Sequence, residues 1–168
     1  MPERRPELSV LFVCAGNICR SPAAEGIFWD LVQASGLSER IFVDSAGTHG
    51  YHTGEMADRR MIDAAKRRHL ILKSRARKVL RNDLEDFEFV IAMDEENLQH
   101  LNALHGAPKA PARLISSFDK NNQWPVSVPD PYYGHSDGFE YVLDMLAALC
   151  PILLDEVVGR LHGKSNDS

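Results

Sequence analysis

The sequence of 168 residues has few cysteines, no excess of positive charge and no long apolar run. Its three cysteines, Cys14, Cys19 and Cys150, are too few for a disulfide framework and fit a reducing compartment. The formal net charge of −5 argues against a nucleic-acid-binding surface. No segment approaches the roughly 18 apolar residues of a membrane span, and the short, charged start does not match a signal peptide. These absences predict a soluble, cytoplasmic protein that binds neither nucleic acid nor membrane.

What is present is an ordinary globular composition, with 44% apolar and 26% charged residues. The length suits one domain, here 1–168, with flexible tails at about 1–7 and 164–168. The sequence shows no internal repeat and no low-complexity block. We expect a monomer or a weak dimer.

Strand and helix patterns alternate along the chain. Runs rich in β-branched and aromatic residues predict strands, and segments with helical apolar spacing predict helices between them. The predicted strands cover 8–13, 41–47, 87–94 and, more weakly, 112–117, and the predicted helices cover 21–35, 55–69, 95–104 and 139–163. Pro151 is expected to kink or interrupt the last helix. This alternation predicts an α/β fold with a parallel sheet, and the segment 116–138 is long enough to be a functional loop.

The segment between the first predicted strand and its helix has an unusual composition. Cys14 ends the strand, Ser21 can cap the helix, and Gly16 and Asn17 tolerate backbone conformations that other residues avoid. Because α/β proteins place their sites at the carboxyl ends of parallel strands, the loop amides and the positive helix end should bind an anion. Arg20 adds a planar guanidinium that matches two phosphate oxygens. The predicted phosphate-binding residues are Ala15, Gly16, Asn17, Ile18, Cys19 and Arg20.

Such a loop would hold a tetrahedral oxyanion with its central atom facing the sulfur of Cys14. The positive field of the loop favours the thiolate, and the hydroxyl of Ser21 can donate a hydrogen bond to it. This arrangement predicts displacement at phosphorus through a phosphocysteine intermediate. The alternative is a buried structural cysteine at a strand end, which gives no reason for Asn17 and Arg20 to stand beside it.

A second stretch with chemical meaning is VPDPYYG. Cleavage of a phosphate ester needs an acid that protonates the leaving oxygen, and Asp130 lies between Pro129 and Pro131, which stiffen the backbone. Tyr132 and Tyr133 follow directly and can flank an aryl group. The alternative for this stretch is an ordinary Asp-Pro turn, and the stretch alone does not decide between the two.

Several stretches together resemble the low-molecular-weight protein tyrosine phosphatase family. They are VCAGNICRSPAAEGIF, VDSAGT, DRR, SRARKV, FVIAMDEENL and DPYYG, which follow the family's order along most of the chain. The resemblance implies a four-stranded parallel sheet flanked by helices on both faces, with the phosphate-binding loop after the first strand. It also implies hydrolysis of phosphotyrosine in proteins or peptides, and of other aryl phosphate monoesters, without metal or cofactor. Cys14 would be the nucleophile, Arg20 the phosphate clamp and Asp130 the general acid.

The resemblance also implies supporting residues and a substrate rim. Ser21 would accompany the thiolate, Ser45 would support the strained Asn17, and Cys19 would be a redox partner of Cys14. The rim would consist of Tyr51, Tyr132 and Tyr133.

Three positions depart from the family pattern. Tyr51 stands where many relatives have a tryptophan on the cleft rim, which affects the expected shape of the rim. Ser74 stands where some relatives have a histidine in the support around the asparagine; a serine can hydrogen-bond there but cannot titrate. His69 replaces a frequent glycine, so the helix before it is expected to end differently.

Three other functions remain open. A thiol-dependent arsenate reductase needs further cysteines, and Cys150, on an apolar helix face, is interpreted as a core residue. Protein-arginine phosphatases of the same fold carry threonine where this chain has Ile18. A non-catalytic phosphate-binding module would not need the combination of Cys14, Arg20 and Asp130.

Two remaining features have simpler interpretations. His49 and His52 lack metal-ligand spacing and are expected to be loop residues rather than ligands, so no metal site is predicted. The basic run 66–78 is expected to be a solvated helix end and loop, although it can also attract acidic substrates.

Overall fold

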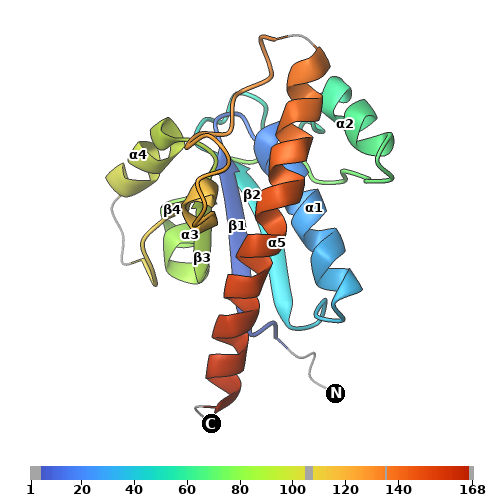
Figure 1. Ribbon diagram of the computed structural model, residues 1–168. Helices are drawn as coiled ribbons and strands as arrows, with labels where there is room; N and C mark the ends of the chain where they lie inside the picture. Colours follow the sequence, from blue (N-terminus) through green and yellow to red (C-terminus); the bar gives the residue numbers. More distant parts are fainter. Residues whose placement is uncertain (1–4, 105–107, 135, 167–168) are drawn as a thin grey trace.

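The computed structural model describes residues 5–104, 108–134 and 136–166. The centre of this part is a parallel sheet of four strands in the order β2-β1-β3-β4 (Figure 1). The strands are β1 (Leu8–Cys14), β2 (Ile41–Gly47), β3 (Phe89–Ala92) and β4 (Arg113–Leu114). The helices are α1 (Arg20–Ala34), α2 (Arg59–Lys66), α3 (Arg81–Asp86), α4 (Glu95–Ala103) and α5 (Ser136–Asn166), with a 3-10 turn at Ile115–Phe118. The predicted four-stranded α/β fold is confirmed.

Helices cover both faces of this sheet. Helices α1 and α5 pack together on one face, and α2 packs against α5. Helices α3 and α4 contribute Leu84 and Leu101 to a second apolar cluster on the other face. Successive β1 residues alternate between the clusters: Phe12 lies in the first, whereas Leu11 lies in the second. A strand covered on both faces explains why β1 is a continuous apolar run.

Three strands differ from their predicted ranges, the first only by the addition of Cys14. The third strand covers Phe89–Ala92 and not the predicted 87–94. The fourth is reduced to Arg113–Leu114, since Ile115–Phe118 turns into a 3-10 helix that buries Ile115 and Phe118. The fourth strand also had the weakest sequence pattern, which agrees with its short length in the structure.

The second helix is shorter than its predicted range of 55–69. Met56 pairs with Arg75 in an isolated β-bridge, and Asp58 caps the helix by accepting a hydrogen bond from the backbone N–H of Arg60. The helix therefore begins only at Arg59. Helix α3 was not predicted, because its six residues are too few to show an apolar period.

Helix α5 continues through Pro151, so of the two effects expected of this proline, a kink or an interruption, the interruption is wrong. A proline removes the hydrogen bond to the carbonyl four residues earlier, which here belongs to Ala147. Pro151 and Ala147 both lie on the exposed side of the helix, where water can satisfy the freed carbonyl. On the opposite side Leu146, Leu149 and Leu153 are fully buried. Their burial favours the unbroken helix over an interruption at the proline.

The structure describes part of each end of the chain. Of the predicted tails, residues 1–4 and 167–168 lie outside the described residues, whereas 164–166 continue α5. The backbone N–H of Glu7 donates to the carbonyl of Arg40 at 2.9 Å, which ties the segment before β1 to the segment before β2. Within the described ranges no helix is long and apolar enough to cross a membrane.

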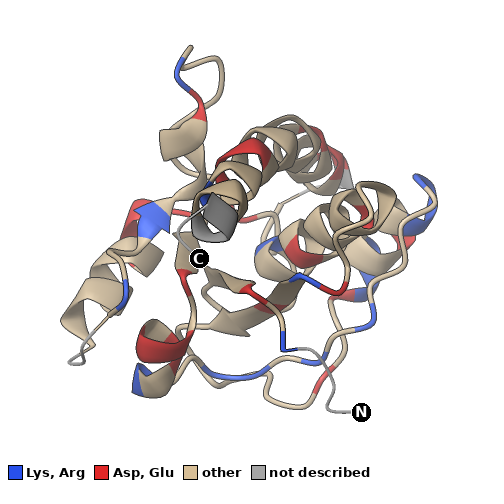
Figure 2. Ribbon diagram, turned by 90° about the horizontal axis from the view of Figure 1, so that it is seen from below, with Lys and Arg blue, Asp and Glu red and all other residues tan. Residues whose placement is uncertain are grey.

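Charged residues of both signs lie on the outer helices and coils, whereas the central strands are mostly uncharged (Figure 2). Some of these charges pair between elements. Arg67 and Arg68, just after α2, form ion pairs of 2.9 and 2.6 Å with Glu140 of α5. Exposed pairs of this kind each contribute about 0.2–1 kcal/mol, so packing rather than charge fixes α2 on α5.

Candidate active site

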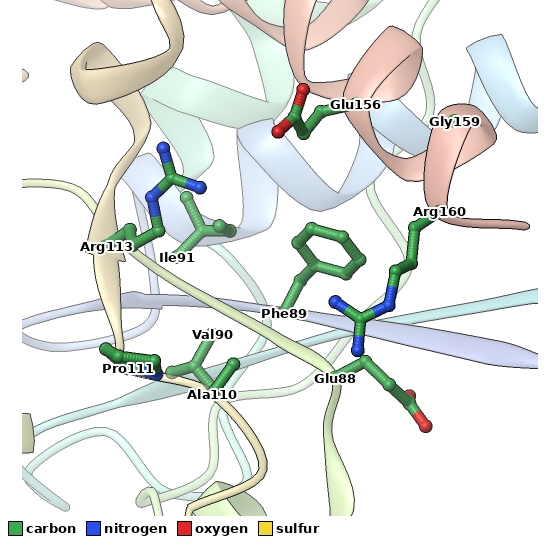
Figure 3. Close-up of a pocket in the computed structure, with 10 residues that line it drawn as sticks. All are labelled: Glu88, Phe89, Val90, Ile91, Ala110, Pro111, Arg113, Glu156, Gly159 and Arg160. Atoms are coloured by element: carbon green, nitrogen blue, oxygen red, sulfur yellow. The ribbon is translucent and has the colours of Figure 1, made fainter. Parts of the chain in front are cut away.

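The cavities of the structure differ in the chemistry that they offer. One of about 350 Å³ lies beside β3 and β4, with an apolar floor at Phe89 and Ile91 and the cations Arg113 and Arg160 at its sides (Figure 3). Among the described residues, no cysteine, serine or histidine lines it. Another cavity, of about 210 Å³, lies at the carboxyl end of β1 and is lined by Cys14, Arg20 and Asp130. The predicted catalytic residues therefore meet in this second cavity, although they are far apart in the sequence.

The loop between Cys14 and Arg20 is held by the end of β2. The backbone N–H groups of Thr48 and His49 donate to the carbonyls of Cys14 and Ala15, each at 2.9 Å. Gly47 permits this close approach, since a Cβ atom there would lie 2.8 Å from the carbonyl oxygen of Ala15. The first helical residue of α1 is Arg20, so the positive end of this helix points at the loop.

Asn17 occupies the one backbone conformation in this loop that most residues avoid, with a φ of 59°. Its side-chain amide donates to the hydroxyls of Ser21 at 2.8 Å and Ser45 at 3.0 Å. Its side-chain oxygen accepts from the backbone N–H of Arg77 at 3.0 Å. All polar groups of this buried side chain are thus used to hold the loop in shape.

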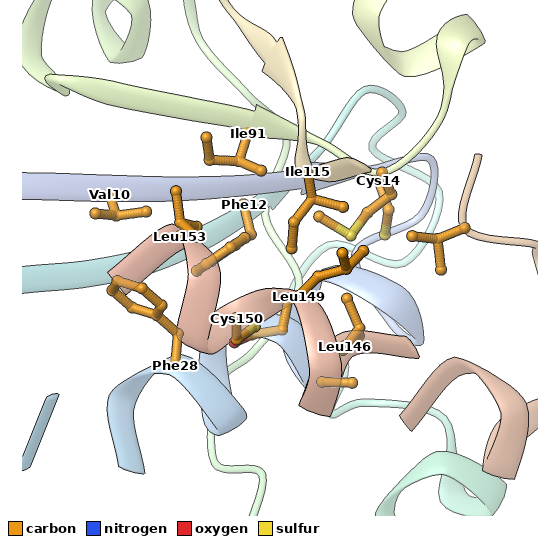
Figure 4. Close-up of a cluster of buried hydrophobic side chains, with 14 of the residues drawn as sticks. Val10, Phe12, Cys14, Phe28, Ile91, Ile115, Leu146, Leu149, Cys150 and Leu153 are labelled. Atoms are coloured by element: carbon orange, nitrogen blue, oxygen red, sulfur yellow. The ribbon is translucent and has the colours of Figure 1, made fainter. Parts of the chain in front are cut away.

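The sulfur of Cys14 lies on the apolar core and receives polar contacts from the loop (Figure 4). It is 3.0 Å from the hydroxyl oxygen of Ser21, and the backbone N–H of Asn17 donates to it at 3.3 Å. Ser21 accepts from the Asn17 amide, and its own hydrogen has two acceptors within reach, the sulfur at 3.0 Å and the more distant carbonyl of Ala46 at 3.4 Å. The hydroxyl of Ser21 and the amide of Asn17 thus place polar hydrogens beside the sulfur.

Arg20 is fully buried and fixed by two acceptors. Its Nη1 donates to Asp94 Oδ2 at 2.6 Å and to the carbonyl of Val128 at 3.0 Å. Burial alone would lower the pKa of Arg20, but the neighbouring Cys14 and Asp94 raise the pKa above its ordinary value. The guanidinium is therefore a permanent positive charge of fixed orientation at the floor of the cavity.

Asp130 lies at the mouth of the cavity, on the loop that precedes α5. One carboxylate oxygen is 3.7 Å from Nη2 of Arg20, and the other accepts from the backbone N–H of Tyr132 at 3.0 Å. Its side chain is 42% exposed, so water can reach the carboxyl group. Tyr51, Tyr132 and Tyr133 also line this cavity and form its aromatic rim.

The two loops of the site are joined by Asp58 and Arg60. The backbone N–H of Asp58 donates to the carbonyl of Ile18 in the phosphate-binding loop at 2.8 Å. The Asp58 carboxylate accepts two hydrogen bonds from the Arg60 guanidinium, which also donates to the carbonyl of Tyr132 at 3.0 Å. The hydrogen bonding of the Arg60 side chain to the Asp58 carboxylate lowers the pKa of Asp58 below its ordinary value. The contacts fix the spacing between the two loops.

Cys19 lines the same cavity but is almost fully buried. Burial raises the pKa of its thiol well above the ordinary value, and the nearby carboxylate of Asp58 adds to this rise. Cys19 is therefore a neutral thiol next to the Cys14 loop at neutral pH. Cys150 is fully buried in the core, as its apolar surroundings in the sequence predicted.

Sequence reasoning missed several residues that hold the site in place. Asp94 fixes Arg20, and Glu25 accepts a hydrogen bond of 2.5 Å from the hydroxyl of Ser45. Ser74 also hydrogen-bonds to Glu25, whose pKa is raised because the carboxyl is buried. The position of Asp94 two residues after β3 was a usable signal, because it is at the same sheet edge as Cys14. Across residues 5–104, 108–134 and 136–166, no group of three or more His, Cys, Asp or Glu side chains is arranged to hold a metal ion.

A four-stranded parallel sheet with an anion-binding loop after its first strand is the architecture of a class of protein phosphatases. Within that class, the chain belongs to the family of low molecular weight phosphotyrosine protein phosphatases, because the model of that family matches residues 9–162.

Individual relatives agree with this assignment. The low molecular weight phosphotyrosine protein phosphatase of Homo sapiens is 39% identical over 151 residues, which cover 88% of this chain and 94% of that protein. A protein tyrosine phosphatase from Entamoeba histolytica, crystallised with Hepes in the active site, has a TM-score of 0.86 and 37% identity. The match covers 90% of this chain and 97% of the Entamoeba chain. A Drosophila arginine phosphatase has a TM-score of 0.81 and 30% identity, with 88% of this chain and 96% of that chain covered.

Proposed function

We propose that this chain hydrolyses phosphotyrosine in proteins or peptides, and other aryl phosphate monoesters, through a phosphocysteine intermediate and without a metal ion. The Cys14 thiolate attacks phosphorus, and the bond from phosphorus to the aryl oxygen breaks. The leaving oxygen takes a proton from the protonated carboxyl of Asp130. Water then attacks the phosphocysteine and gives a proton to the Asp130 carboxylate, which releases phosphate and regenerates the thiolate.

The observation that carries this proposal is the meeting of Cys14, Arg20 and Asp130 in one cavity. The thiol lies at the floor, among loop amides and the helix end that can hold the three non-bridging phosphate oxygens. Arg20 supplies the matching positive charge, and Asp130 lies at the mouth, where a leaving oxygen would emerge. In this proposal the reaction takes place in the cytoplasm, which would keep the three cysteines as the free thiols found here.

An aryl substrate is favoured by the depth and the rim of the cavity. The Cys14 side chain is buried, whereas Tyr51 and Tyr133 are 81% and 91% exposed, so a substrate must pass the rim to reach the sulfur. A phosphotyrosine side chain is several ångströms longer than phosphoserine and can stack on these rings. We therefore propose a strong preference for aryl over alkyl phosphates.

A second candidate function is phosphoarginine hydrolysis, which the similarity to the Drosophila arginine phosphatase brings into consideration. Ile18 bears on this choice, because it lines the cavity and is almost fully buried. An apolar side chain there suits an aromatic ring better than a guanidinium group, which needs polar partners when it leaves water. The aryl phosphate is therefore the proposed substrate.

The test compares three matched peptides that differ only in phosphotyrosine, phosphoserine or phosphoarginine. We expect kcat/KM to be highest for phosphotyrosine, with turnover unchanged by EDTA. Equal rates for phosphoserine and phosphotyrosine would contradict the proposed selectivity. A higher rate for phosphoarginine would favour the second candidate, and the variant Ile18→Thr would then be expected to increase that rate further.

A further inference from the structure

An extended segment with exposed positive charges runs between α2 and α3. Lys73, Arg75 and Lys78 are all exposed on this segment, and we refer to these three residues as the basic strip. Seen from below, several Lys and Arg positions recur along one coil at the side of the molecule (Figure 2). A molecule with a formal net charge of −5 thus presents a local positive surface on this segment.

The basic strip is fastened to the segment that forms one side of the active-site mouth. The backbone N–H of Gly54 donates to Ala76, and that of Ala76 donates to Glu55, each at 2.8 Å. The backbone N–H of Gly47 donates to the carbonyl of Arg77 at 2.8 Å. Residues 47–55 therefore lie directly against the strip, and they include the mouth residues His49, Tyr51 and His52.

Two cations of the strip are held at this rim. The Arg75 guanidinium donates to the carbonyl of Gly54 at 3.0 Å. The Lys78 side chain lies against Gly50, because its Cδ atom is 3.6 Å from where a Cβ of Gly50 would be. Gly50 immediately precedes Tyr51 of the rim. A positive charge therefore lies next to the aromatic entrance of the site.

Neighbouring carboxylates do not neutralise the strip. Glu55 forms an ion pair of 2.7 Å with His52. Asp44 and Asp83 both pair with Arg77, at 3.0 and 2.9 Å. Among the ion pairs of the described ranges, none includes Lys73, Arg75 or Lys78. Their charges are available to a partner.

We propose that the basic strip binds acidic residues that flank the phosphotyrosine of the substrate protein, so that the preferred substrates are acidic phosphopeptide segments. This inference rests on the function proposed above. An extended chain advances at most about 3.3–3.6 Å per residue, so Arg75 lies within about 11 Å and Lys73 within about 18 Å of Lys78 along the segment. The strip thus matches about three to five substrate residues on one side of the phosphotyrosine.

The test uses phosphotyrosine peptides with acidic, neutral or basic residues on the N-terminal or the C-terminal side. Each kcat/KM is divided by that for 4-nitrophenyl phosphate, which has no flanking residues. For the wild type we expect acidic residues on one side to increase this ratio about 3–10-fold, and the gain to decrease with added salt.

The variant Lys73→Glu/Lys78→Glu tests the strip and leaves the hydrogen bond of Arg75 intact. The matched control, Lys120→Glu/Arg160→Glu, changes the net charge equally but at residues outside the basic strip, which line two other cavities of the molecule. We expect the acidic preference to be lost or reversed in the strip variant and kept in the control.

Three results would overturn the inference. The first is a wild type that does not prefer acidic flanking residues. The second is an equal loss of that preference in the strip variant and the control. The third is a strip variant that keeps the preference unchanged. If the wild type turns over 4-nitrophenyl phosphate without an acidic preference, only this inference fails. If it does not turn over 4-nitrophenyl phosphate at all, the proposed function fails, and this inference fails with it.

Discussion

At the scale of single residues, the site depends on a chain of hydrogen bonds that links the thiol of Cys14 to the carboxyl group of Glu25. Asn17 donates to Ser21 and Ser45, Ser21 is in contact with the Cys14 sulfur, and Ser45 donates to Glu25. The positive φ of Asn17 was predictable, because few residue types tolerate it. The role of Glu25 was not predictable, because its partners come from other elements and no local pattern marks it.

Asp130 offers the sharpest test of a single side chain. We predict that Asp130→Asn lowers kcat by roughly 10²–10⁴-fold for aryl phosphates with poor leaving groups, because the amide cannot protonate the leaving oxygen. The formation of the intermediate should be affected much less for 4-nitrophenyl phosphate, whose leaving group needs no proton. Single-turnover rates for a series of aryl phosphates measure this difference.

The control for Asp130 is Asp137→Asn, an exposed carboxyl at the start of α5. It should retain wild-type rates for every leaving group. Equal losses of the single-turnover rate for good and poor leaving groups in Asp130→Asn would remove Asp130 from the role of general acid.

Cys19 is predicted to protect Cys14 from irreversible oxidation. Peroxide oxidises the Cys14 thiolate to a sulfenic acid, which can condense with the Cys19 thiol to form a disulfide and water. We expect wild type to recover its activity with dithiothreitol, and Cys19→Ser to recover less. Because burial raises the pKa of Cys19, disulfide formation should accelerate with increasing pH as more thiolate forms.

Intact mass and activity, measured before and after reduction, check this prediction. Cys150→Ser serves as the control, since Cys150 lies in the core and not in the cavity. The protective role is wrong if Cys19→Ser recovers as fully as the wild type, or if no disulfide between Cys14 and Cys19 forms.

At the scale of elements, predictions from sequence succeeded where burial imposes a pattern. The apolar run of β1 is buried on both faces, and it predicted a central strand correctly. The short α3 and the early end of the fourth strand leave too few residues for any period to appear. Pro151 misled the prediction because the sequence does not reveal that Ala147 faces solvent.

His69, shortly after the end of α2, has a strained backbone conformation that a substitution can relieve. His69 has a φ of 63°, and the backbone N–H of Leu70 donates to the carbonyl of Ala65 at 3.0 Å, a helix end that normally uses glycine. We predict that His69→Gly raises the free energy of unfolding by about 1 kcal/mol, because glycine has no Cβ to clash in this conformation. Urea unfolding measures the change.

His69→Ala is the matched control, since alanine removes the imidazole but keeps the Cβ. It should show no gain in stability, which separates the backbone effect from the loss of the side chain. A gain in His69→Ala equal to that in His69→Gly would show that the imidazole, and not the backbone, causes the strain.

At the scale of the whole molecule, the fold brings together residues from four separate segments. Cys14 ends β1, Asp94 follows the neighbouring strand β3, and Arg20 begins α1. Asp130 reaches them because Val128 on its loop donates its backbone N–H to the carbonyl of Met93 at 2.9 Å. The motif of the loop 14–20 predicted that Cys14 and Arg20 belong to the site. The position of Asp130 was implied only by the family resemblance, because no rule of sheet topology places a loop of that length.

The most direct test of the proposed chemistry is detection of a phosphoryl group on Cys14 during turnover. The wild type and Asp130→Asn are mixed with 4-nitrophenyl phosphate, stopped in denaturant within the first turnover, digested and analysed by mass spectrometry. We predict one phosphoryl group on the peptide that contains Cys14. Its amount should be higher in Asp130→Asn, which lacks the base that activates water, and Cys14→Ser should lack turnover. Turnover by the wild type with no phosphoryl group on Cys14 in either protein, or with the group on another residue, would contradict the mechanism.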